Sequence, residues 1–344
     1  MAAARTIISN PATIAALITE VAAFAPDVVH FHNFFPTLSP AAIDAVARQG
    51  IPVVHTLHNF RMICPGALLL RDGKLCEDCV DRSKLCSVIY SCYRGSRLGS
   101  ALVLVTGLYF NTLLTRHRRL LTLLTRTEFA KSRFLAAGIP ADSMAICANF
   151  IADPGPGLTT RDRRIVCVAR LSHEKGVDTL LRAAANVDGT IEIIGDGPER
   201  ARLEAIAPSN VIFRGFLPRP QVLERIKSAT ALAVPSRCYE AGIPITALDA
   251  MATGTPVLAS RLGSLLEAVI HRDTGILVPQ NDVAAWQVEM RLLLLDPHKA
   301  AALGARGRAR YLQRHTEQAG LNSLTKIYES AMQKSNRVDS GDVT

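Results

Sequence analysis

The chain has 344 residues and a formal net charge of +9, and its composition is 49% hydrophobic and 20% charged. This length suits two domains, and the apolar fraction is sufficient for two packed cores, which excludes a disordered protein. The positive charge favours an anionic partner, such as a nucleotide phosphate, a lipid headgroup or a nucleic acid. Aromatic residues make up only 5% of the chain and no basic run alternates with them, which argues against a groove for single-stranded nucleic acid.

Two apolar segments need to be tested against membrane or secretion signals. Residues 1–26 resemble a weak secretion signal, but Pro11 and Glu20 interrupt the apolar run, so we expect a helix of a cytoplasmic protein. Residues 98–115 carry no charge, but glycine, serine, threonine and asparagine dilute them below a convincing membrane span. The basic residues 116–119 that follow favour the solvated end of a domain helix, with contact to anionic lipid as the alternative.

Apolar runs of strand length alternate with helical patterns along the chain, which is typical of parallel sheets covered by helices on both faces. The predicted strands of the first half are residues 27–32, 52–58, 120–125 and 144–149. Those of the second half are residues 164–169, 190–195, 211–215, 231–236, 256–260 and 275–279. Residues 152–163 contain proline, glycine and charged residues typical of a linker. We therefore predict an α/β fold with two Rossmann-like, doubly wound domains, residues 1–153 and 154–344, and expect the active site in a cleft between them.

A nicotinamide-dependent enzyme is the competing interpretation of this fold. The segment GDGPER, residues 195–200, follows a predicted strand and precedes a helix. Gly195 and Gly197 match the first two glycines of the dinucleotide motif G-x-G-x-x-G, but Arg200 occupies the third position. This mismatch argues against a dinucleotide site.

Two cations follow the first predicted strand of the second half. The segment VARLSHEKG, residues 168–176, places Arg170 and Lys175 in the loop before a helix. Because both then lie at the carboxyl edge of the sheet, they predict a diphosphate site, where a forked guanidinium and a compact ammonium bind different oxygens. The alternative is a pair of solvated loop charges, with Lys175 paired to Glu174 or Asp178.

Residues 235–260, PSRCYEAGIPITALDAMATGTPVLAS, place a carboxylate and a glycine-containing loop between two apolar strands. Glu240 in this loop can accept hydrogen bonds from sugar hydroxyl groups. The amides that follow can approach a ligand closely, because glycine has no side chain to obstruct it. These predicted donor-binding residues are Ala241, Gly242 and Ile243.

Further candidate ligand groups follow this loop. Asp249 lies about two turns into the next predicted helix, where its carboxylate can accept both hydroxyl groups of a ribose; the alternative is a solvated helix acid. The segment SRLGSLLEAV, residues 260–269, repeats the order of strand, glycine loop and helix. It adds Gly263 and the amides near Ser264 as further phosphate donors.

Four cysteines in the first half, Cys76, Cys79, Cys86 and Cys92, are spaced C-x2-C-x6-C-x5-C. Four such ligands can close a structural zinc site that orders a loop. The spacing lacks a second C-x2-C pair, so thiols of local structural use or disulfides are the alternatives, and a reducing cytosol disfavours disulfides.

The order of these motifs resembles the retaining glycosyltransferases of family 4. In the second half the resemblance is carried by VARLSHEKG, IIGDGPER, VIFRGFLP, PSRCYEAGIP, DAMATGTPVLAS, GSLLEAV and TGILVP, and it covers nearly all of that half. In the first half, DVVHFHNFFPTLSP, VVHTLHNFRMICP, RDGKLCEDC and CYRGSRLGS are similar to a bacterial subgroup of that family with a cysteine-rich loop. The resemblance implies a GT-B fold in which the first domain binds the acceptor.

The resemblance implies transfer of a sugar from a UDP- or GDP-sugar to a glycan or lipid-linked acceptor, with retention at the anomeric carbon. It implies that Arg170 and Lys175 hold the donor diphosphate, that Glu240 contacts the sugar and that Asp249 binds ribose. The histidine of the family's T-x-H segment matches His58, near the transferred sugar and the acceptor. Without the resemblance, His58 is equally a histidine at a strand end.

The mechanism implied is departure of the nucleotide on the same face as acceptor attack. Arg170 and Lys175 would neutralise charge on the leaving diphosphate, and a phosphate oxygen would take the acceptor's proton. Because side chains supply the countercharge, no cofactor or magnesium ion is required, and no clustered Asp motif is present to hold one.

Two features depart from the family pattern. Glu240 and Asp249 are separated by eight residues, whereas the family has two glutamates separated by seven. The family also begins with a strand, a glycine-rich loop and further units, roughly 80 residues, that have no counterpart here. We therefore expect the strand at 27–32 to lie at a sheet edge and the first domain to be incomplete.

Three hypotheses follow. An active cytoplasmic glycosyltransferase of polysaccharide biosynthesis is favoured, with peripheral contact to the cytoplasmic face of a membrane left open because lipid-linked acceptors are common in the family. A truncated, inactive homologue that acts as a binding partner or scaffold is the alternative. A zinc-ordered basic module that binds nucleic acid is the third and least favoured.

Overall fold

The computed structural model describes residues 9–33, 35 and 38–339. Part of the expected N-terminal helix and part of the motif DVVHFHNFFPTLSP lie outside these residues. By their contacts the described residues form two compact units. The first unit comprises residues up to Arg71, Cys76–Cys147 and the residues from Leu321 onwards, and the second comprises Asp72–Leu75 and Ala148–Gly320.

The first unit is built on a parallel sheet with the strand order β1-β2-β5-β6. Its strands are β1 (Val29–His32), β2 (Val53–Thr56), β5 (Leu121–Thr125) and β6 (Met144–Ile146), which confirms the four strands predicted for this half. β2 and β5 are buried along their whole length, as expected for central strands covered on both faces. Within the described residues β1 pairs only with β2, so it is an edge strand, as predicted.

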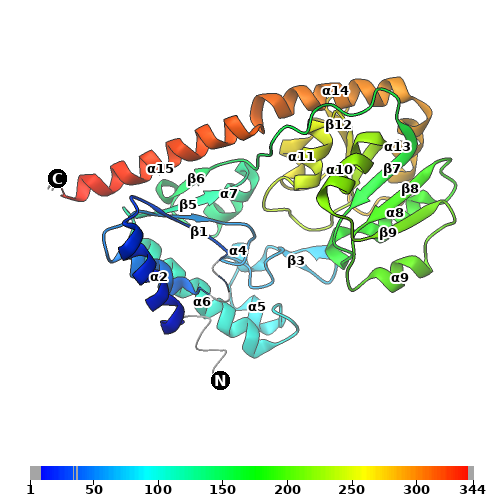
Figure 1. Cartoon of the computed structure of the whole chain (residues 1–344). Helices are drawn as coiled ribbons and strands as arrows, with labels where there is room; N and C mark the ends of the chain where they lie inside the picture. Colours follow the sequence, from blue (N-terminus) through cyan, green and yellow to red (C-terminus); the bar gives the residue numbers. More distant parts are fainter. Residues whose placement is uncertain (1–8, 34, 36–37, 340–344) are drawn as a thin grey trace. The chain divides into compact units, whose positions relative to one another are not determined.

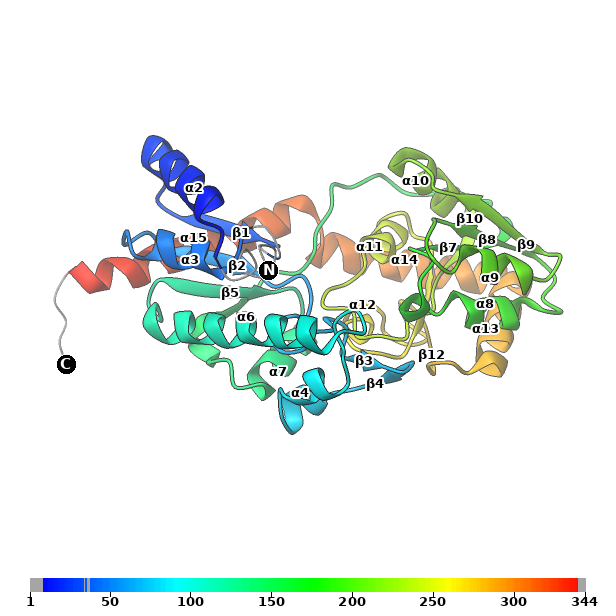
Figure 2. The same ribbon diagram turned by 90° about the horizontal axis from the view of Figure 1, so that it is seen from below.

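The helices of the first unit can be followed with its sheet in Figure 2. They are α2 (Pro11–Phe24), α3 (Pro40–Ala47), α4 (Asp78–Asp81), α5 (Cys86–Ile89), α6 (Arg97–Arg116), α7 (Glu128–Ala136) and the end of α15 (Glu317–Asp339). Side-chain caps fix the first residue of three of these helices. Asn10 for α2, Ser96 for α6 and Thr127 for α7 each accept a hydrogen bond from a backbone amide of the first turn.

Helix α6 is long and apolar enough to cross a membrane by length and composition alone. However, 44% of its most apolar 18-residue stretch is buried inside the protein. Val103, Phe110 and Leu113 are among the residues that fill the core of the unit. This burial is typical of a core helix and agrees with the expectation of a domain helix.

The C-terminal helix departs from the predicted domain boundaries. The predicted second domain spans residues 154–344, whereas the residues from Leu321 onwards group with the first unit. The phenolic oxygen of Tyr328 lies 2.7 Å from Nδ1 of His30 on β1, and Lys334 donates to the carbonyl oxygen of Asp142. These contacts join elements that are far apart in sequence, so no local pattern indicates them.

The second unit contains a parallel sheet with the strand order β12-β11-β10-β7-β8-β9; β7, β8, β9 and β12 are labelled in Figure 1. Its strands are β7 (Asp162–Val168), β8 (Thr190–Ile194), β9 (Val211–Gly215), β10 (Ala229–Val234), β11 (Val257–Ser260) and β12 (Gly275–Val278), which confirms the six predicted strands. The chain runs outward from β7 to β9 and then returns to the other side of β7 at β10. The strand order therefore reverses between β7 and β10, where ligands of such sheets bind.

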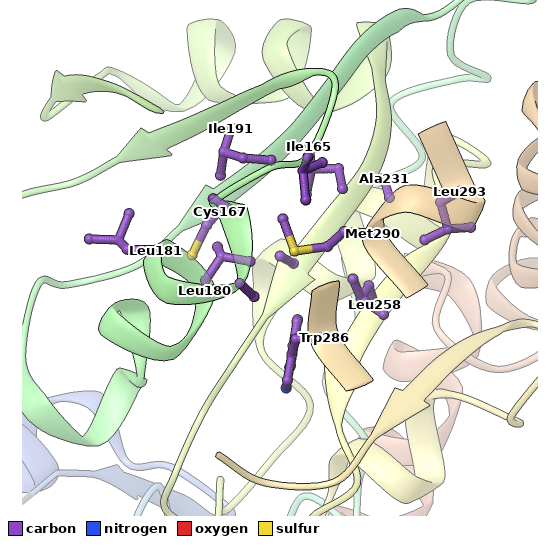
Figure 3. Packing of buried hydrophobic residues seen from close by; sticks show 14 of the residues in the cluster. Ile165, Cys167, Leu180, Leu181, Ile191, Ala231, Leu258, Trp286, Met290 and Leu293 are labelled. Carbon is purple, nitrogen blue, oxygen red and sulfur yellow. The ribbon is translucent and has the colours of Figure 1, made fainter. Parts of the chain in front are cut away.

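Helices cover both faces of this sheet. They are α8 (Val177–Ala184), α9 (Arg200–Ala205), α10 (Arg219–Ser228), α11 (Ile245–Ala252), α12 (Leu265–Ala268), α13 (Val283–Leu295) and α14 (Pro297–Arg314). One core cluster packs Cys167 of β7 against Leu180 of α8 and Trp286 of α13 (Figure 3). A second cluster packs Leu232 of β10 with Leu248 of α11 and other residues. Two filled cores fix the sheet and its loops.

A short hairpin was not predicted. β3 (Leu70–Arg71) and β4 (Lys74–Leu75) form a two-stranded sheet, and the turn residues Asp72 and Gly73 both have positive φ angles. This is the Asp-Gly signal of a tight hairpin turn, which the sequence carries.

Candidate active site

A cavity of about 220 Å³ lies in the second unit at the carboxyl ends of β7 and β10. It is therefore at the point where the strand order reverses. Arg170, Lys175 and Glu240, three residues singled out in the sequence, all line it. The structure thus brings these three side chains together from two separate loops.

Gly176 allows these loops to meet. It has a φ angle of +65°, and a Cβ added to it would lie 2.1 Å from the carbonyl oxygen of Pro235. Any other residue would be strained in this conformation and would collide with the backbone of the opposite loop. Glycine is therefore required for the loop after β7, which ends in the 3-10 turn His173–Lys175, to lie against the loop after β10.

Lys175 and Glu240 form an ion pair in the cavity. Nζ of Lys175 lies 2.7 Å from Oε1 of Glu240, and the hydroxyl of Ser236 donates to the same oxygen at 2.8 Å. Burial of the ammonium acts to lower the pKa of Lys175, but the charge of Glu240 and its hydrogen bond outweigh burial, so this pKa is raised. Lys175 is therefore a cation held in place by Glu240, not by Glu174 or Asp178.

Arg170 supplies a second positive charge. Its side chain lines the cavity, and among the described residues no ion pair or hydrogen bond engages its guanidinium. An exposed guanidinium with all its donors free, beside a held ammonium, can bind an anion such as a diphosphate.

The glycines once compared with a dinucleotide motif serve loop packing. A Cβ added to Gly195 would lie 1.9 Å from the carbonyl oxygen of Ala169, and one added to Gly197 would lie 2.4 Å from that of Leu171. These carbonyls flank Arg170. Both glycines therefore let the loop after β8 pack against the loop that carries Arg170. Arg200 instead pairs with surface carboxylates of its own helix region.

Arg237 is a further residue of this loop that no sequence pattern indicated. The residue is only 5% exposed. Its Nη2 donates to Asp178 and to Thr179 at 2.8 Å each, and its Nε donates to Asn281 at 2.6 Å. A buried charge needs such partners, and here they connect the loop of Glu240 to helix α8.

The loop after Glu240 presents free backbone donors. Within the described residues, none of the amides of Ala241, Gly242 and Ile243 donates to a backbone carbonyl or to a side chain. Ser264 supports this loop by donating its hydroxyl hydrogen to the carbonyl oxygen of Glu240 at 2.7 Å. Gly263 precedes it with a positive φ angle of 51°.

Asp249 does not line this cavity. It is 2% exposed, and both of its carboxylate oxygens accept hydrogen bonds from Arg219, at 2.8 and 3.1 Å. Burial raises the pKa of Asp249, and the charge of Arg219 opposes this effect. The predicted ribose contact therefore concerns a carboxylate that is already engaged in a forked ion pair.

His58 belongs to the first unit, where it lines a cavity of about 580 Å³. Nδ1 of His32 lies 2.8 Å from Nε2 of His58. Burial, the charge of Arg126 and that of His32 together lower the pKa of His58 to about 4, so its imidazole is neutral at neutral pH. A neutral imidazole can donate one hydrogen bond and accept another.

Zinc was one of the alternatives left open for the cysteine cluster, and the structure does not favour it. None of Cys76, Cys79, Cys86 and Cys92 forms a disulfide, and no group of three or more His, Cys, Asp or Glu in the described part of the chain is placed to hold a metal. Cys79 and Cys86 lie in separate short helices, α4 and α5. Burial raises the pKa of Cys79 to about 12, as is typical of a buried structural thiol.

Comparison with known families identifies the chain. Residues 3–152 match the model described as Glycosyltransferase Family 4, and residues 152–310 match the model described as Glycosyl transferases group 1. The chain therefore belongs to the family 4 type of glycosyltransferases with the GT-B fold.

Two relatives illustrate this membership. The GDP-mannose-dependent alpha-(1-6)-phosphatidylinositol monomannoside mannosyltransferase of Mycolicibacterium smegmatis is 30% identical over 53% of this chain and 55% of its own length. The D-inositol 3-phosphate glycosyltransferase of Thermobispora bispora is 27% identical over 90% of this chain and 72% of its own length. The chain spans about half the length of the first relative.

Solved structures share the fold. Anabaena Alr3699/HepE in complex with UDP and glucose has a TM-score of 0.65 and 17% identity, over 93% of this chain and 80% of that one. Sucrose-phosphate synthase from Thermosynechococcus elongatus has a TM-score of 0.69 and 21% identity, over 93% of this chain and 77% of that one. At these identities the likeness concerns the fold alone.

Proposed function

We propose that this chain transfers a sugar from a UDP- or GDP-sugar to a glycan or lipid-linked acceptor with retention at the anomeric carbon. The observation that carries the proposal is the cavity at the reversal point of the second sheet, where Arg170 is unengaged and Lys175 is held by Glu240. Such a pair of cations suits the diphosphate of a nucleotide sugar. The Mycolicibacterium smegmatis relative is named for a GDP-sugar donor and a phosphatidylinositol-linked acceptor, which supports this proposal.

In this proposal Arg170 and Lys175 stabilise the negative charge that develops on the leaving diphosphate. The cavity is partly sheltered from water, so each charge-assisted contact is worth more there than on an open surface. The free amides of Ala241, Gly242 and Ile243 serve as additional donors, and Glu240 contacts the sugar. Side-chain cations supply the countercharge, so the proposed reaction requires no cofactor.

Two further residues, His58 of the first unit and Asp249 of the second, take proposed roles from the resemblance alone. His58 contributes a neutral imidazole near the transferred sugar and the acceptor, which fits its lowered pKa. Asp249 binds ribose only if it exchanges its ion pair with Arg219 for the two hydroxyl groups.

The proposed location is the cytoplasmic face of a membrane. Helix α6 exposes Leu98, Val105 and Leu108 and ends at Arg116, the first of the basic residues 116–119. An apolar face beside basic residues can rest on anionic lipid, where a lipid-linked acceptor is available.

A binding role without turnover is the second candidate. The edge strand β1 has one strand neighbour among the described residues, and an unpaired edge can add a strand from another chain. In that case the chain would bind a nucleotide sugar and release no nucleotide.

The deciding experiment measures release of UDP or GDP from the corresponding glucose or mannose donors. We expect Arg170→Ala and Lys175→Ala each to lower turnover by about 10²–10³-fold, as for the loss of one transition-state donor. Arg202→Ala is the matched control, because Arg202 pairs with Glu199 on the surface of α9. Donor binding without nucleotide release in the wild type would support the binding role instead.

A further inference from the structure

The cavity of the first unit contains two arginines that have no role in the proposed function. This cavity of about 580 Å³ is lined by Arg61 and Arg94 as well as His58. Among the described residues that line it, none is an aspartate or a glutamate. Its volume is that of a small-molecule site, and its charge is entirely positive.

Arg61 is held in a fixed position. Its backbone amide donates to Oδ1 of Asn59 at 2.9 Å, and its Nη1 donates to the carbonyl oxygen of Pro65 at 3.0 Å. Its guanidinium lies 4.8 Å from the centre of the Phe35 ring and 5.5 Å from that of Tyr93. These contacts leave further guanidinium donors available and engage no carboxylate.

Arg94 approaches the same aromatic ring from the following turn. Its guanidinium lies 5.4 Å from the centre of the Tyr93 ring. Arg94 and Gly95 both adopt positive φ angles, of 53° and 68°, a backbone conformation that few non-glycine residues adopt. The turn thus places Arg94 beside Tyr93 at a conformational cost, as local strain at binding sites often does.

The two arginines act on each other. Burial lowers the pKa of Arg61, and the charge of Arg94 acts in the same direction. Arginine remains protonated at neutral pH, so two like charges share one cavity. Within the described residues no ion pair neutralises either of them. An anion between them would relieve this repulsion.

We infer that the acceptor carries a phosphate ester, which binds between Arg61 and Arg94 in the cavity that also contains His58. This inference rests on the proposed glycosyl transfer, whose acceptor belongs to the first unit. Guanidinium groups match phosphate oxygens in forked pairs. The neutral His58 in the same cavity is then available for a hydroxyl group of the acceptor. A soluble sugar phosphate and a lipid-linked phosphate share this chemistry.

The test is calorimetric binding of glycerol 3-phosphate, with glycerol as the neutral counterpart. We expect the wild type to bind glycerol 3-phosphate and not glycerol, and Arg61→Gln and Arg94→Gln each to weaken binding by at least about tenfold. Arg97→Gln is the matched control, since Arg97 is exposed and does not line the cavity. Arg94→Glu, at an exposed position, weakens binding further and tests the charge without altering the core.

A second arm uses vesicles of phosphatidylcholine with and without phosphatidic acid. Binding of vesicles that contain phosphatidic acid, with the same dependence on Arg61 and Arg94 and no binding of glycerol 3-phosphate, assigns the phosphate to a lipid. Binding of neither probe, or equal weakening by Arg97→Gln, overturns the inference.

Failure of the two proposals can be told apart by UDP binding to the second unit. Wild-type UDP binding that is lost in Arg170→Ala, together with no phosphate binding, rejects the phosphate acceptor and keeps the donor site. Phosphate binding that depends on Arg61 and Arg94, together with no UDP binding, rejects the proposed transferase and keeps the anion site.

Discussion

Lys175 and Glu240 lie 65 positions apart in the sequence, yet their charged groups are 2.7 Å apart. The pair forms because Gly176 lets the loop after β7 pack against Pro235 of the loop after β10. The carboxylate raises the pKa of this ammonium in spite of its burial. A preformed cation of this kind needs little rearrangement when a diphosphate binds or leaves.

Glu240→Gln separates the role in sugar binding from the role in diphosphate binding. The amide keeps the shape of the side chain and removes its charge. If Glu240 contacts the sugar, the rate of transfer from UDP-glucose falls by about 10²-fold. UDP lacks the sugar, so its affinity, measured by calorimetry, falls by less than about tenfold. Glu204→Gln, which affects a surface pair with Arg200, serves as the control. Equal losses for UDP and UDP-glucose would contradict this role.

Gly176→Ala tests the contact between the two loops. The substitution forces a side chain into a left-handed conformation, which costs about 1–2 kcal/mol, and also drives its Cβ into the carbonyl of Pro235. Gly155→Ala isolates the first effect, because Gly155 has a φ angle of +76° and no atom within 4 Å of an added Cβ. We expect urea unfolding to show that Gly176→Ala loses about 1–3 kcal/mol more stability than Gly155→Ala. Equal losses at the two positions would show that the loops can separate without cost.

The strands and the cation motif could be predicted because their signals are local. In a parallel sheet the central strands are continuous apolar runs, and residues just after a strand lie at the carboxyl edge. Arg170, Lys175 and Glu240 follow this rule. The resemblance then indicated which of several such loops carry the donor site.

The partners of these residues could not be predicted because their signals are not local. Arg237 meets Asp178 across 59 positions, and Arg219 meets Asp249 across 30. Charged residues are common on surfaces, so nothing in the sequence marks Arg237 as buried. The cysteine spacing, in contrast, left a metal site open as one alternative, and no group of metal ligands is found among the described residues.

Arg237→Met removes the cation from a buried ion pair. Among the described residues, Asp178 then keeps the more exposed Arg182 as its ion-pair partner, and we expect a loss of about 3–5 kcal/mol in the free energy of unfolding. Arg182→Met removes the more exposed partner of the same carboxylate, so its loss stays below about 1 kcal/mol.

A double variant checks the cause of this effect. Adding Asp178→Asn to Arg237→Met removes the carboxylate charge that lost its buried partner, and part of the stability returns. Additive losses in the double variant would show that the two side chains do not act on each other. Denaturant titration of the four proteins completes the cycle.

The histidines of the first unit predict how stability depends on pH. Burial lowers the pKa of His55 from 6.5 to about 3, and burial with neighbouring charges lowers that of His30 to about 4. A group whose pKa is depressed on folding stabilises the protein above its unfolded pKa and loses this contribution as the pH falls towards its folded pKa. Between pH 6.5 and about pH 5, His55 alone therefore accounts for a loss of about 2 kcal/mol. Urea titrations across this window should show the decline in the wild type and in the exposed control His298→Gln, and a flatter profile in His55→Gln. Constant stability of the wild type between these pH values would refute the lowered pKa of His55.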